Sequence, residues 1–408
     1  MNTNFTPPAG LAFGVAPGTA TITAALSAVS ASTALTVANY SVGGTQSLLP
    51  AGASVTVLNG TDSLTLTNST TSPTSKVPFY FNTALPLGTA YNVSVSAQPT
   101  AGVHPCTVLD GIGTITTTYI TSVQVVCGPA VGTLAGTANF MGSFANGTAA
   151  AAAFNGPRGV AVDSAGNAYV ADLANELIRK ITPGGVVTTL AGTTGVIGYV
   201  NGTGTTASFW QPTGVAVDTS GNVYVADSGN NAIRKITPAG VVSTFAGSST
   251  GAWGFANGTG TGATFNMPDD VAVDTAGNVY VADTGNNVIR KITPAGVVSI
   301  YAGTVITAQT GGFANGPATT AMFSMPTDVA VDTAGNVYVA DWGNALIRLI
   351  TPAGMVSTLA GINNNVVTTI DGPALSATFD CPYSVAVDST GHVYVSDNFY
   401  STIRKFTP

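Results

Sequence analysis

A motif that recurs five times in the carboxy-terminal two-thirds of the chain constrains its fold more than any other feature. The motif runs Val-Ala-Val-Asp, then Gly-Asn, then Tyr-Val-Ala-Asp, with small changes between copies. Its first aspartate returns at intervals of 55, 56, 58 and 56 residues, as Asp163, Asp218, Asp274, Asp332 and Asp388. Supersecondary units that repeat at such a period fold as stacked or radial arrays, because one unit alone cannot bury its apolar face.

Each unit has the pattern of four short antiparallel strands. In the second unit, Val215–Val217 is an apolar run too short for a helix and typical of a strand buried on both faces. Turn sequences rich in Gly, Asn and Pro separate it from Val223–Ala226, Ala232–Thr237 and Val241–Phe245. Four antiparallel strands repeated radially make a β-propeller, which leaves few strand edges exposed. We therefore expect an all-β fold with one blade per unit.

Composition agrees with this class and excludes others. Only 7% of residues are charged and 49 are glycine, which favours sheets and turns over helices. A net charge of −7 without basic clusters argues against nucleic-acid binding. The chain has no apolar run of about 18 residues, so we expect no transmembrane helix. The first ten residues lack the features of a signal peptide, so either export uses a segment missing from this chain or the protein stays inside the cell.

The two ends of the array complement each other. The last unit stops at Pro408, before its fourth strand, and Val131–Gly136 matches that strand in sequence ahead of the first unit (compare Ser357–Gly361). We expect Val131–Gly136 to pair with the last unit and to close a five-bladed ring. A ring of six blades, one too divergent to recognise, is the alternative.

The repeated Gly-Val-Ala-Val-Asp, Gly-Asn-x-Tyr-Val-Ala-Asp and Ile-Arg-Lys segments, with a preceding Phe-x-x-Pro, resemble the NHL-repeat family of β-propellers over residues 131–408. NHL propellers are commonly six-bladed, so five units are a departure. Some relatives of the fold are lyases that use metal-bound histidine. The only histidines here, His104 and His392, lie in different predicted domains and cannot form such a site. We expect no enzyme activity, no catalytic residues and no cofactor.

Residues 1–39 and 40–130 are expected to form two further modules. The segments Val15–Thr23 and Ser32–Val37 resemble the last strands of a bacterial Ig-like module of the Big-2 type. The earlier strands are missing, so either the native protein is longer or a neighbouring chain supplies strands by β-augmentation. Residues 40–130 resemble a small Ig-like module of bacterial surface proteins and have the size of one β-sandwich.

Two of the three cysteines, Cys106 and Cys127, flank a predicted hairpin near the end of the second module. Their separation suits a disulfide, which indicates an oxidising compartment and an extracellular or cell-surface location. Two buried free thiols in a cytosolic protein are the alternative.

Two columns of aspartate recur in the repeat. The first aspartates named above end the inner strands and could bind Ca²⁺ through carboxylate oxygens at one mouth of the channel. The alternative, that each caps its own Asp-x-x-Gly turn, better suits a residue present in every copy. The second column lies seven residues before an arginine, which predicts a structural ion pair in each blade: Asp172–Arg179, Asp227–Arg234, Asp283–Arg290, Asp341–Arg348 and Asp397–Arg404.

Binding specificity is expected in the irregular linkers between units. They share a face with the Asp-x-x-Asn turns, and exposed aromatic side chains on that face would suit a glycan or a partner protein. The candidates are Tyr199, Trp210, Trp253, Phe255, Phe313 and Trp342. The alternative is that aromatic residues of this region are core plugs.

These patterns favour an extracellular, non-catalytic binding or scaffold protein in which Ig-like spacers present a propeller. A structural subunit of an extracellular filament, joined by strand complementation through the N-terminal segment, is the second hypothesis. A propeller lyase is the third and is disfavoured by the missing histidine ligands.

Overall fold

The computed structural model describes residues 19–26, 29–36, 40–49, 52–68, 76–99, 106–116, 120–127, 133–137, 142–305, 311–363 and 369–408. Every regular element in these ranges is a β-strand or a three-residue 3₁₀ turn, as the predicted all-β fold requires. The chain divides into two compact units, Met1–Leu134 and Ala135–Pro408. In the described ranges, no helix has the length and apolar character needed to cross a membrane.

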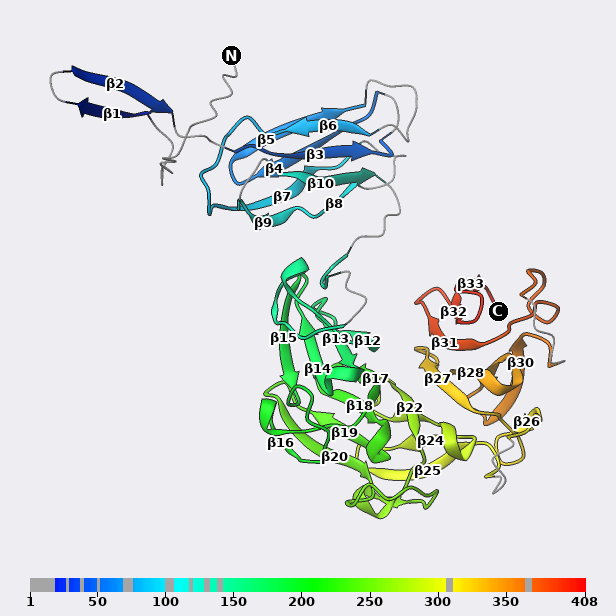
Figure 1. Cartoon of the computed structure of the whole chain (residues 1–408). Helices are drawn as coiled ribbons and strands as arrows, with labels where there is room; N and C mark the ends of the chain where they lie inside the picture. Colours follow the sequence, from blue (N-terminus) through cyan, green and yellow to red (C-terminus); the bar gives the residue numbers. More distant parts are fainter. Residues whose placement is uncertain are drawn as a thin grey trace. The chain divides into compact units, whose positions relative to one another are not determined.

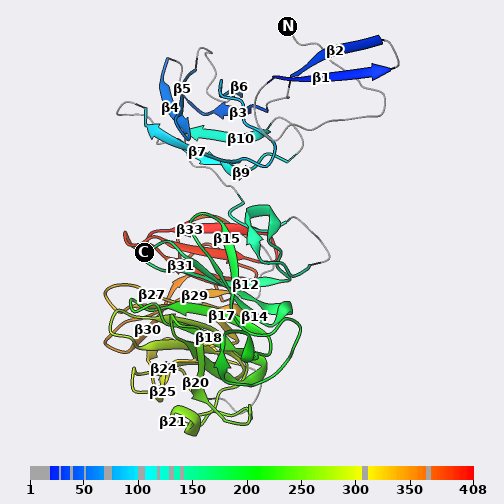
Figure 2. The same ribbon diagram turned by 90° about the vertical axis from the view of Figure 1, so that its left-hand side faces the viewer.

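The N-terminal unit contains a hairpin and a two-layered sandwich. The hairpin pairs β1 (Thr19–Leu26) with β2 (Val29–Thr36). The sandwich has two four-stranded sheets, in the orders β6-β3-β10-β8 and β5-β4-β7-β9 (Figure 1 and Figure 2). Alternating side chains from both sheets, among them Val42, Val55 and Val125, form one buried core. Whether this sandwich is an Ig-like module stays a prediction. Its strands are β3 (Val42–Ser47), β4 (Ser54–Asn59), β5 (Asp62–Thr67), β6 (Val77–Tyr80), β7 (Ala90–Ala97), β8 (Cys106–Leu109), β9 (Ile112–Thr114) and β10 (Ile120–Cys127).

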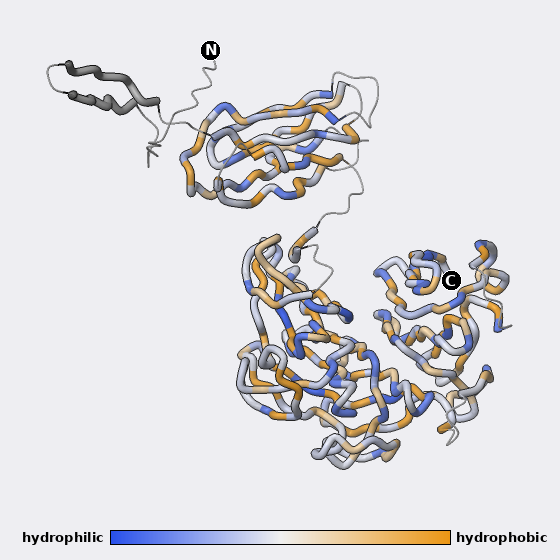
Figure 3. Tube along the Cα trace, in the orientation of Figure 1, coloured by the Kyte–Doolittle hydropathy of each residue, from blue (hydrophilic) through white to orange (hydrophobic). Residues whose placement is uncertain are grey.

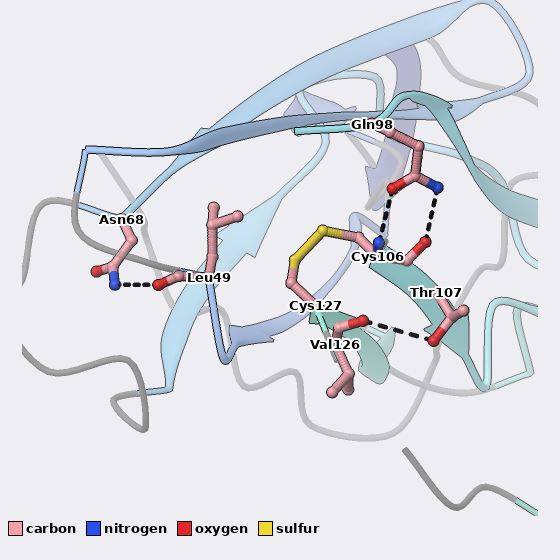
Figure 4. Close-up of a disulfide and its surroundings, with 7 residues drawn as sticks. All are labelled: Leu49, Asn68, Gln98, Cys106, Thr107, Val126 and Cys127. Atoms are coloured by element: carbon pink, nitrogen blue, oxygen red, sulfur yellow. Dashed lines mark hydrogen bonds between the residues drawn. A yellow bond between two sulfur atoms is a disulfide. The ribbon is translucent and has the colours of Figure 1, made fainter. Parts of the chain in front are cut away.

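A disulfide joins two strands of this sandwich. Cys106 in β8 and Cys127 in β10 are register partners and are bonded through sulfur (Figure 4). The Gln98 side chain brackets Cys106, since its amide nitrogen donates to the Cys106 carbonyl at 2.9 Å and its oxygen accepts from the Cys106 N–H at 2.6 Å. Both cysteines are buried, so the bond closes one end of the core.

The C-terminal unit contains five blade-like sheets, one for each sequence repeat. In each blade the strand order follows the chain, with the innermost strand first, because short turns join consecutive antiparallel strands. Blade 1 has β12 (Pro157–Val162), β13 (Ala168–Asp172), β14 (Leu177–Ile181) and β15 (Val186–Ala191). Blade 2 has β17 (Pro212–Val217), β18 (Val223–Asp227), β19 (Ala232–Ile236) and β20 (Val241–Gly247). Blade 3 has β22 (Pro268–Val273), β23 (Val279–Asp283), β24 (Val288–Ile292) and β25 (Val297–Ala302). Blade 4 has β27 (Pro326–Val331), β28 (Val337–Asp341), β29 (Leu346–Ile350) and β30 (Met355–Ala360). Blade 5 has β31 (Pro382–Val387), β32 (Val393–Asp397) and β33 (Thr402–Phe406).

A short outermost strand, absent from the predicted four-strand unit, completes the first four blades. Each linker first runs along the outer edge of the blade that follows it, where two of its residues pair with the fourth strand. These strands are β11 (Gly147–Thr148), β16 (Gly202–Thr203), β21 (Gly258–Thr259) and β26 (Gly316–Pro317). A two-residue strand carries no alternating apolar pattern, so the sequence gives little sign of it.

Hydrophobic cores between consecutive blades hold the array together. One core joins Tyr169, Ala171 and Ile178 of blade 1 to Phe209 and Val215 of blade 2, and the same arrangement returns at the next three junctions. Figure 3 shows hydrophobic residues recurring along the strands of the blades, with hydrophilic residues between them. Burial of apolar side chains on both faces of a sheet is the main term that stabilises such an array.

The expected closure of the ring is not made in this structure. Within the described residues, β33 pairs only with β32, and no further strand lies beside it (Figure 1). Thr133–Gly136 forms an irregular bend and not a strand, and Val131 and Gly132 lie outside the described residues. The prediction from the sequence was therefore wrong for this conformation, because matching a strand pattern does not bring two sheet edges together.

Candidate binding site

In each of the first four blades, a buried Asp–Arg pair holds the preceding linker against the blade. In blade 2, Arg234 donates from Nη1 to Asp227 Oδ2 at 2.7 Å and to the Ser208 carbonyl at 3.1 Å. Its Nη2 donates to the Val200 carbonyl at 3.0 Å and to Asn201 Oδ1 at 2.7 Å. The pairs Asp172–Arg179, Asp227–Arg234, Asp283–Arg290 and Asp341–Arg348 join at 2.7 to 3.0 Å, and their side chains are fully buried. These arginines are scaffold residues with no free face for a ligand.

The fifth pair is looser. Arg404 lies 3.7 Å from Asp397 and donates at 2.6 Å to Asp371, which replaces the asparagine of the other blades. Its side chain is 11% exposed, while the other four arginines are fully buried. The difference follows from the missing fourth strand beside β33.

The first column of aspartates serves the turns of its own blades. Asp163 Oδ1 accepts from the Asn167 N–H at 2.8 Å, and Oδ2 accepts from the Asn167 amide at 2.8 Å and from the Tyr169 hydroxyl at 3.0 Å. These hydrogen bonds lower the pKa of Asp163. Asp218, Asp274, Asp332 and Asp388 make the corresponding bonds, with His392 in place of the asparagine in blade 5. This geometry is that of the turn-capping alternative, not of a Ca²⁺ site. In the described part of the chain, no group of three or more metal-ligating residues is placed to hold an ion.

The linker aromatics divide into exposed and scaffold residues. Trp253 is 73% exposed, Phe255 51% and Trp210 42%. Tyr199 instead stacks on Arg234, with 4.9 Å from the guanidinium to the ring centre, and donates its hydroxyl to the Ser248 carbonyl. Phe313 is 43% exposed, and one of its faces lies 5.0 Å from the guanidinium of Arg348.

Trp342 is half-buried beside Cys381, whose pKa is raised mainly by burial. Of the six aromatic residues predicted to form a binding face, the exposed ones are therefore Trp210, Trp253, Phe255 and Phe313. His104 lies outside the described residues.

A polar cavity lies where the five inner strands begin. Every inner strand opens with Pro-x-x-Val, and the residues at the two middle positions, except Gly214, line a cavity of about 430 Å³. These pairs are Arg158–Gly159, Thr213–Gly214, Asp269–Asp270, Thr327–Asp328 and Tyr383–Ser384. The leading proline of an inner strand pairs with the aspartate that ends the second strand and begins the Asp-x-x-Asn turn. The cavity therefore opens on the same face as these turns and the linkers. We call these residues the channel mouth.

Glycine allows the inner strands of neighbouring blades to approach closely at this mouth. A Cβ on Gly214 would lie 2.2 Å from Asp270 Oδ1 and 2.9 Å from the Asp269 carbonyl oxygen. A Cβ on Gly159 would lie 2.5 Å from the Thr213 carbonyl oxygen. Only glycine fits at either position without moving the neighbouring strand.

Three blades meet at Asp269. Arg158 of blade 1 donates from Nη2 to Asp269 Oδ2 at 2.8 Å, and the Tyr383 hydroxyl of blade 5 donates to the same oxygen at 2.8 Å. The Arg158 guanidinium also stacks on the Tyr383 ring at 4.9 Å. Burial raises the pKa of Asp269 to about 6, although the charge of Arg158 opposes the shift. The Arg158 side chain remains 35% exposed, so part of its donor set faces solvent.

A carboxyl pair forms the opposite wall. Asp270 and Asp328, on adjacent inner strands, hydrogen-bond each other, and burial raises the pKa of both. The charge of Asp328 raises the pKa of Asp270 further, so the two carboxyl groups can share one proton. The Val329 N–H at 3.4 Å and the Val385 N–H at 3.2 Å face the two carboxyl groups. The channel mouth thus offers hydrogen-bond donors and acceptors a few ångströms apart.

These residues were not among the candidates predicted from the sequence, because those candidates came from positions that every copy shares or from the variable linkers. The signal was present in the repeat itself. At the two positions after the leading proline the five copies differ in charge and size, although the flanking residues are nearly constant. Variation confined to two positions of a regular strand marks residues that the blade itself does not need.

Comparison with known proteins supports the repeat and leaves the function open. The NHL repeat family matches residues 154–181, 209–236, 265–292 and 323–348, so NHL repeats are present in the first four blades. Mouse teneurin-3 is 29% identical over 213 residues, which is 47% of this chain and 8% of that protein. SUPPRESSOR OF QUENCHING 1 from Arabidopsis thaliana, a chloroplastic protein, is 38% identical over 93 residues, which is 22% of this chain and 9% of that protein. The chain therefore spans less than a tenth of these relatives.

Several solved structures match this chain at low similarity. An auxiliary nutrient binding protein from Bacteroides ovatus has a TM-score of 0.44 and 16% identity, over 86% of this chain and 90% of that one. A structural genomics protein of unknown function from Bacteroides thetaiotaomicron has a TM-score of 0.43 and 20% identity, over 87% and 90%. A catalytically inactive virginiamycin B lyase from Staphylococcus aureus has a TM-score of 0.39 and 14% identity, over 62% and 69%.

Proposed function

We propose that this chain is a non-catalytic binding protein whose C-terminal unit holds a small polar ligand at the channel mouth. The observation that carries the proposal is that side chains from all five blades line one cavity at the positions where the repeat varies. Concave sites with a few convergent polar groups are the usual form of small-molecule sites.

The lining defines the chemistry of the ligand. Asp269, Asp270 and Asp328 offer carboxyl oxygens, while Arg158 and Ser384 offer donors. Arg158 balances the Asp269 carboxylate, and the Asp270–Asp328 pair shares one proton, so the site carries a net charge of about −1. A ligand rich in hydroxyl or amino groups fits this lining better than an anion. The exposed Trp253 and Phe255 on the same face would widen the contact for a larger ligand.

A binding screen with matched variants tests this site. The probes are a panel of monosaccharides, amino acids and short alkylamines, followed by ligand-observed NMR and by thermal shift. The full chain is compared with Arg158→Met, which removes the ion pair to Asp269, with the linker variant Trp253→Ala, and with Trp342→Ala in the turn that follows β28 of blade 4. We expect at least one probe to bind the wild type and both tryptophan variants and to lose ten-fold or more in affinity with Arg158→Met. Failure of the whole panel, or loss of binding only in the tryptophan variants, would overturn the proposal.

We infer an extracellular or cell-surface location from the Cys106–Cys127 disulfide, because such bonds persist in oxidising compartments. Alkylation of thiols in protein taken directly from its native source checks this inference. Free Cys106 and Cys127 in that material would contradict it.

Assembly into a filament is the second candidate function. Within the described residues, β1 and β2 pair only with each other, which leaves their outer edges open to strand addition. Negative-stain imaging of the purified chain separates the two functions, because discrete particles at all concentrations exclude the filament.

A further inference from the structure

Three residues that directly precede inner strands have a backbone conformation that their side chains disfavour. Gln211, Met267 and Met325 have φ angles of 51°, 49° and 48°. Positive φ is uncommon outside glycine, and the proline that follows each of these residues normally directs it toward extended backbone. In blade 1 the corresponding residue is Gly156, with a φ of 60°. Glycine therefore suits this position best on conformational grounds, yet blades 3 and 4 have methionine there.

A backbone hydrogen bond from the preceding blade holds each methionine in this conformation. The Met267 N–H donates to Asn231 Oδ1 at 2.8 Å, and the Met325 N–H donates to Asn287 Oδ1 at 2.7 Å. Such a bond involves the main chain of the methionine and forms whatever its side chain is. The blades accordingly tolerate glycine, glutamine or methionine at this position.

Both methionine side chains lie largely in solvent. Met267 is 61% exposed and Met325 is 43% exposed. Methionine is one of the residue types most often buried, so the fold alone does not account for two exposed methionines at strained positions. Residues held in sparsely populated backbone conformations cluster at ligand sites, where the surrounding structure compensates for their cost. The strain therefore directs attention to what lies beside the two side chains.

The two methionines border the acidic part of the channel mouth. One proline separates Met267 from Asp269, and another separates Met325 from Thr327. Asp269 and Thr327 both line the cavity of about 430 Å³. The same two blades supply the three aspartates among the lining residues. We call Met267 and Met325 the methionine rim.

A side chain at this position begins on the face onto which the cavity opens. A Cβ on Gly156 would lie 3.8 Å from the Cβ of Ala174, which belongs to the Asp-x-x-Asn turn of blade 1. Blades 3 and 4 repeat the pairing between the leading proline and the aspartate of this turn. The methionine side chains therefore start beside the turns, next to the cavity and on its open side.

We propose that the ligand of the channel mouth is amphiphilic, with a hydroxyl or amino group bound in the cavity and a short alkyl group covered by the methionine rim. This inference rests on the proposed function, because it names the class of ligand for the same site. The carboxyl groups and Arg158 bind the polar group, and the two thioether side chains remove the adjoining alkyl group from water. Methionine suits this role because its unbranched, polarisable side chain adapts to apolar groups of different shape.

Pairs of probes that share a polar group and differ in the length of their alkyl group test the class of ligand. The pairs are propylamine with hexylamine, alanine with norleucine, and methyl β-glucoside with hexyl β-glucoside. Their affinities for the full chain are measured by ligand-observed NMR and by isothermal titration calorimetry. Burial of one methylene is worth about 0.8 kcal/mol, or about four-fold in affinity. A longer alkyl group that the rim covers in part should therefore bind the wild type about five-fold or more tighter in at least one pair.

Glycine substitutions separate this role from a structural one. The double variant Met267→Gly with Met325→Gly removes both side chains and keeps the two backbone N–H bonds to the preceding blades. Because glycine adopts positive φ without strain, the melting temperature should stay within about 2 °C of the wild type or rise. The short probe should bind as it does to the wild type, while the preference for the longer probe should disappear. The matched control is Met355→Val, which changes a 47% exposed methionine to the residue that blades 1 to 3 have there, and it should keep the preference.

The outcomes distinguish this inference from the proposed function. Equal affinity of the wild type for the short and long members of every pair that binds would overturn the amphiphilic class and leave the polar site in place. The same holds for a preference that survives in the double glycine variant. A large fall in the melting temperature of that variant would also overturn the inference, because it would assign the methionines to the fold. Failure of every probe to bind the wild type would overturn both the inference and the proposed function.

Discussion

Substitution of Arg234 by methionine should destabilise the C-terminal unit by about 3–5 kcal/mol, the range for breaking a buried ion pair by removing one partner. Arg234 is fully buried between the rings of Tyr199 and Phe209, with its guanidinium 4.9 and 5.1 Å from their centres. Methionine keeps the apolar contact with both rings, since its unbranched side chain adapts to irregular space. The loss is therefore electrostatic and polar, and not the result of a large cavity.

The magnitude follows from what the substitution leaves behind. Asp227 keeps the Trp210 N–H and the Asn230 amide as donors, at 2.8 and 2.9 Å, but loses its buried cationic partner Arg234. Burial raises the pKa of Asp227 to about 6 even with Arg234 present. The Ser208 carbonyl also loses a donor, while the Val200 carbonyl keeps the Ser208 N–H at 3.1 Å; an unsatisfied buried polar group costs about 1–3 kcal/mol.

The matched control is Lys235→Met on the same strand. Lys235 is half-buried, and its ammonium lies 5.4 Å from the Tyr224 ring, a contact worth about 0.5–1 kcal/mol. Urea unfolding of both variants at pH 7 can be followed by tryptophan fluorescence, because Trp210 sits in the affected blade. Hydrogen exchange localises the effect, since a repeat array can unfold in parts.

The pH dependence gives a second readout. Without Arg234, the folded-state pKa of Asp227 rises further above its unfolded value, so the folded variant binds more protons than the unfolded chain. Its stability should therefore recover as the pH falls from 7 toward 4. Equal losses for Arg234→Met and Lys235→Met, or a loss for Arg234→Met that does not change with pH, would refute the reasoning that the arginine clamps the linker through a buried charge pair.

Three further predictions concern other parts of the chain. Since burial raises the pKa of Asp269 to about 6, stability should fall as the pH rises from 4 to 6, and Asp269→Asn should flatten this slope in thermal melts; an unchanged slope contradicts the assignment. Replacing both Cys106 and Cys127 by alanine should cost the N-terminal unit about 2–4 kcal/mol and leave the calorimetric transition of the other unit unchanged. Gly214→Val should cost at least about 1–3 kcal/mol through its clash with Asp270, whereas Gly372→Ala, with open space at its Cβ, should cost little.

The sequence by itself determined the blades of this protein. Strand length, the apolar inner run, the glycine and asparagine turns and the Asp-to-Arg spacing are all local within about 30 residues, and each unit repeats them. The residues that form a turn and the strands on its two sides are close in sequence. The hairpins and the Asp227–Arg234 contact therefore follow from the sequence of one unit alone. The disulfide between Cys106 and Cys127 is likewise a contact across neighbouring positions of one sheet.

Only the tertiary structure decided where polar groups converge and where the array stays open. Arg158, Asp269 and Tyr383 are separated by 111 and 114 residues, and they meet because the radial array brings the beginnings of three inner strands to one axis. Trp342 looked like an exposed binding residue, but it packs at the next blade beside Cys381. The unpaired edge of β33 has the same origin. A strand pattern specifies which residues can pair, whereas the packing of whole blades sets which edges come within hydrogen-bonding distance.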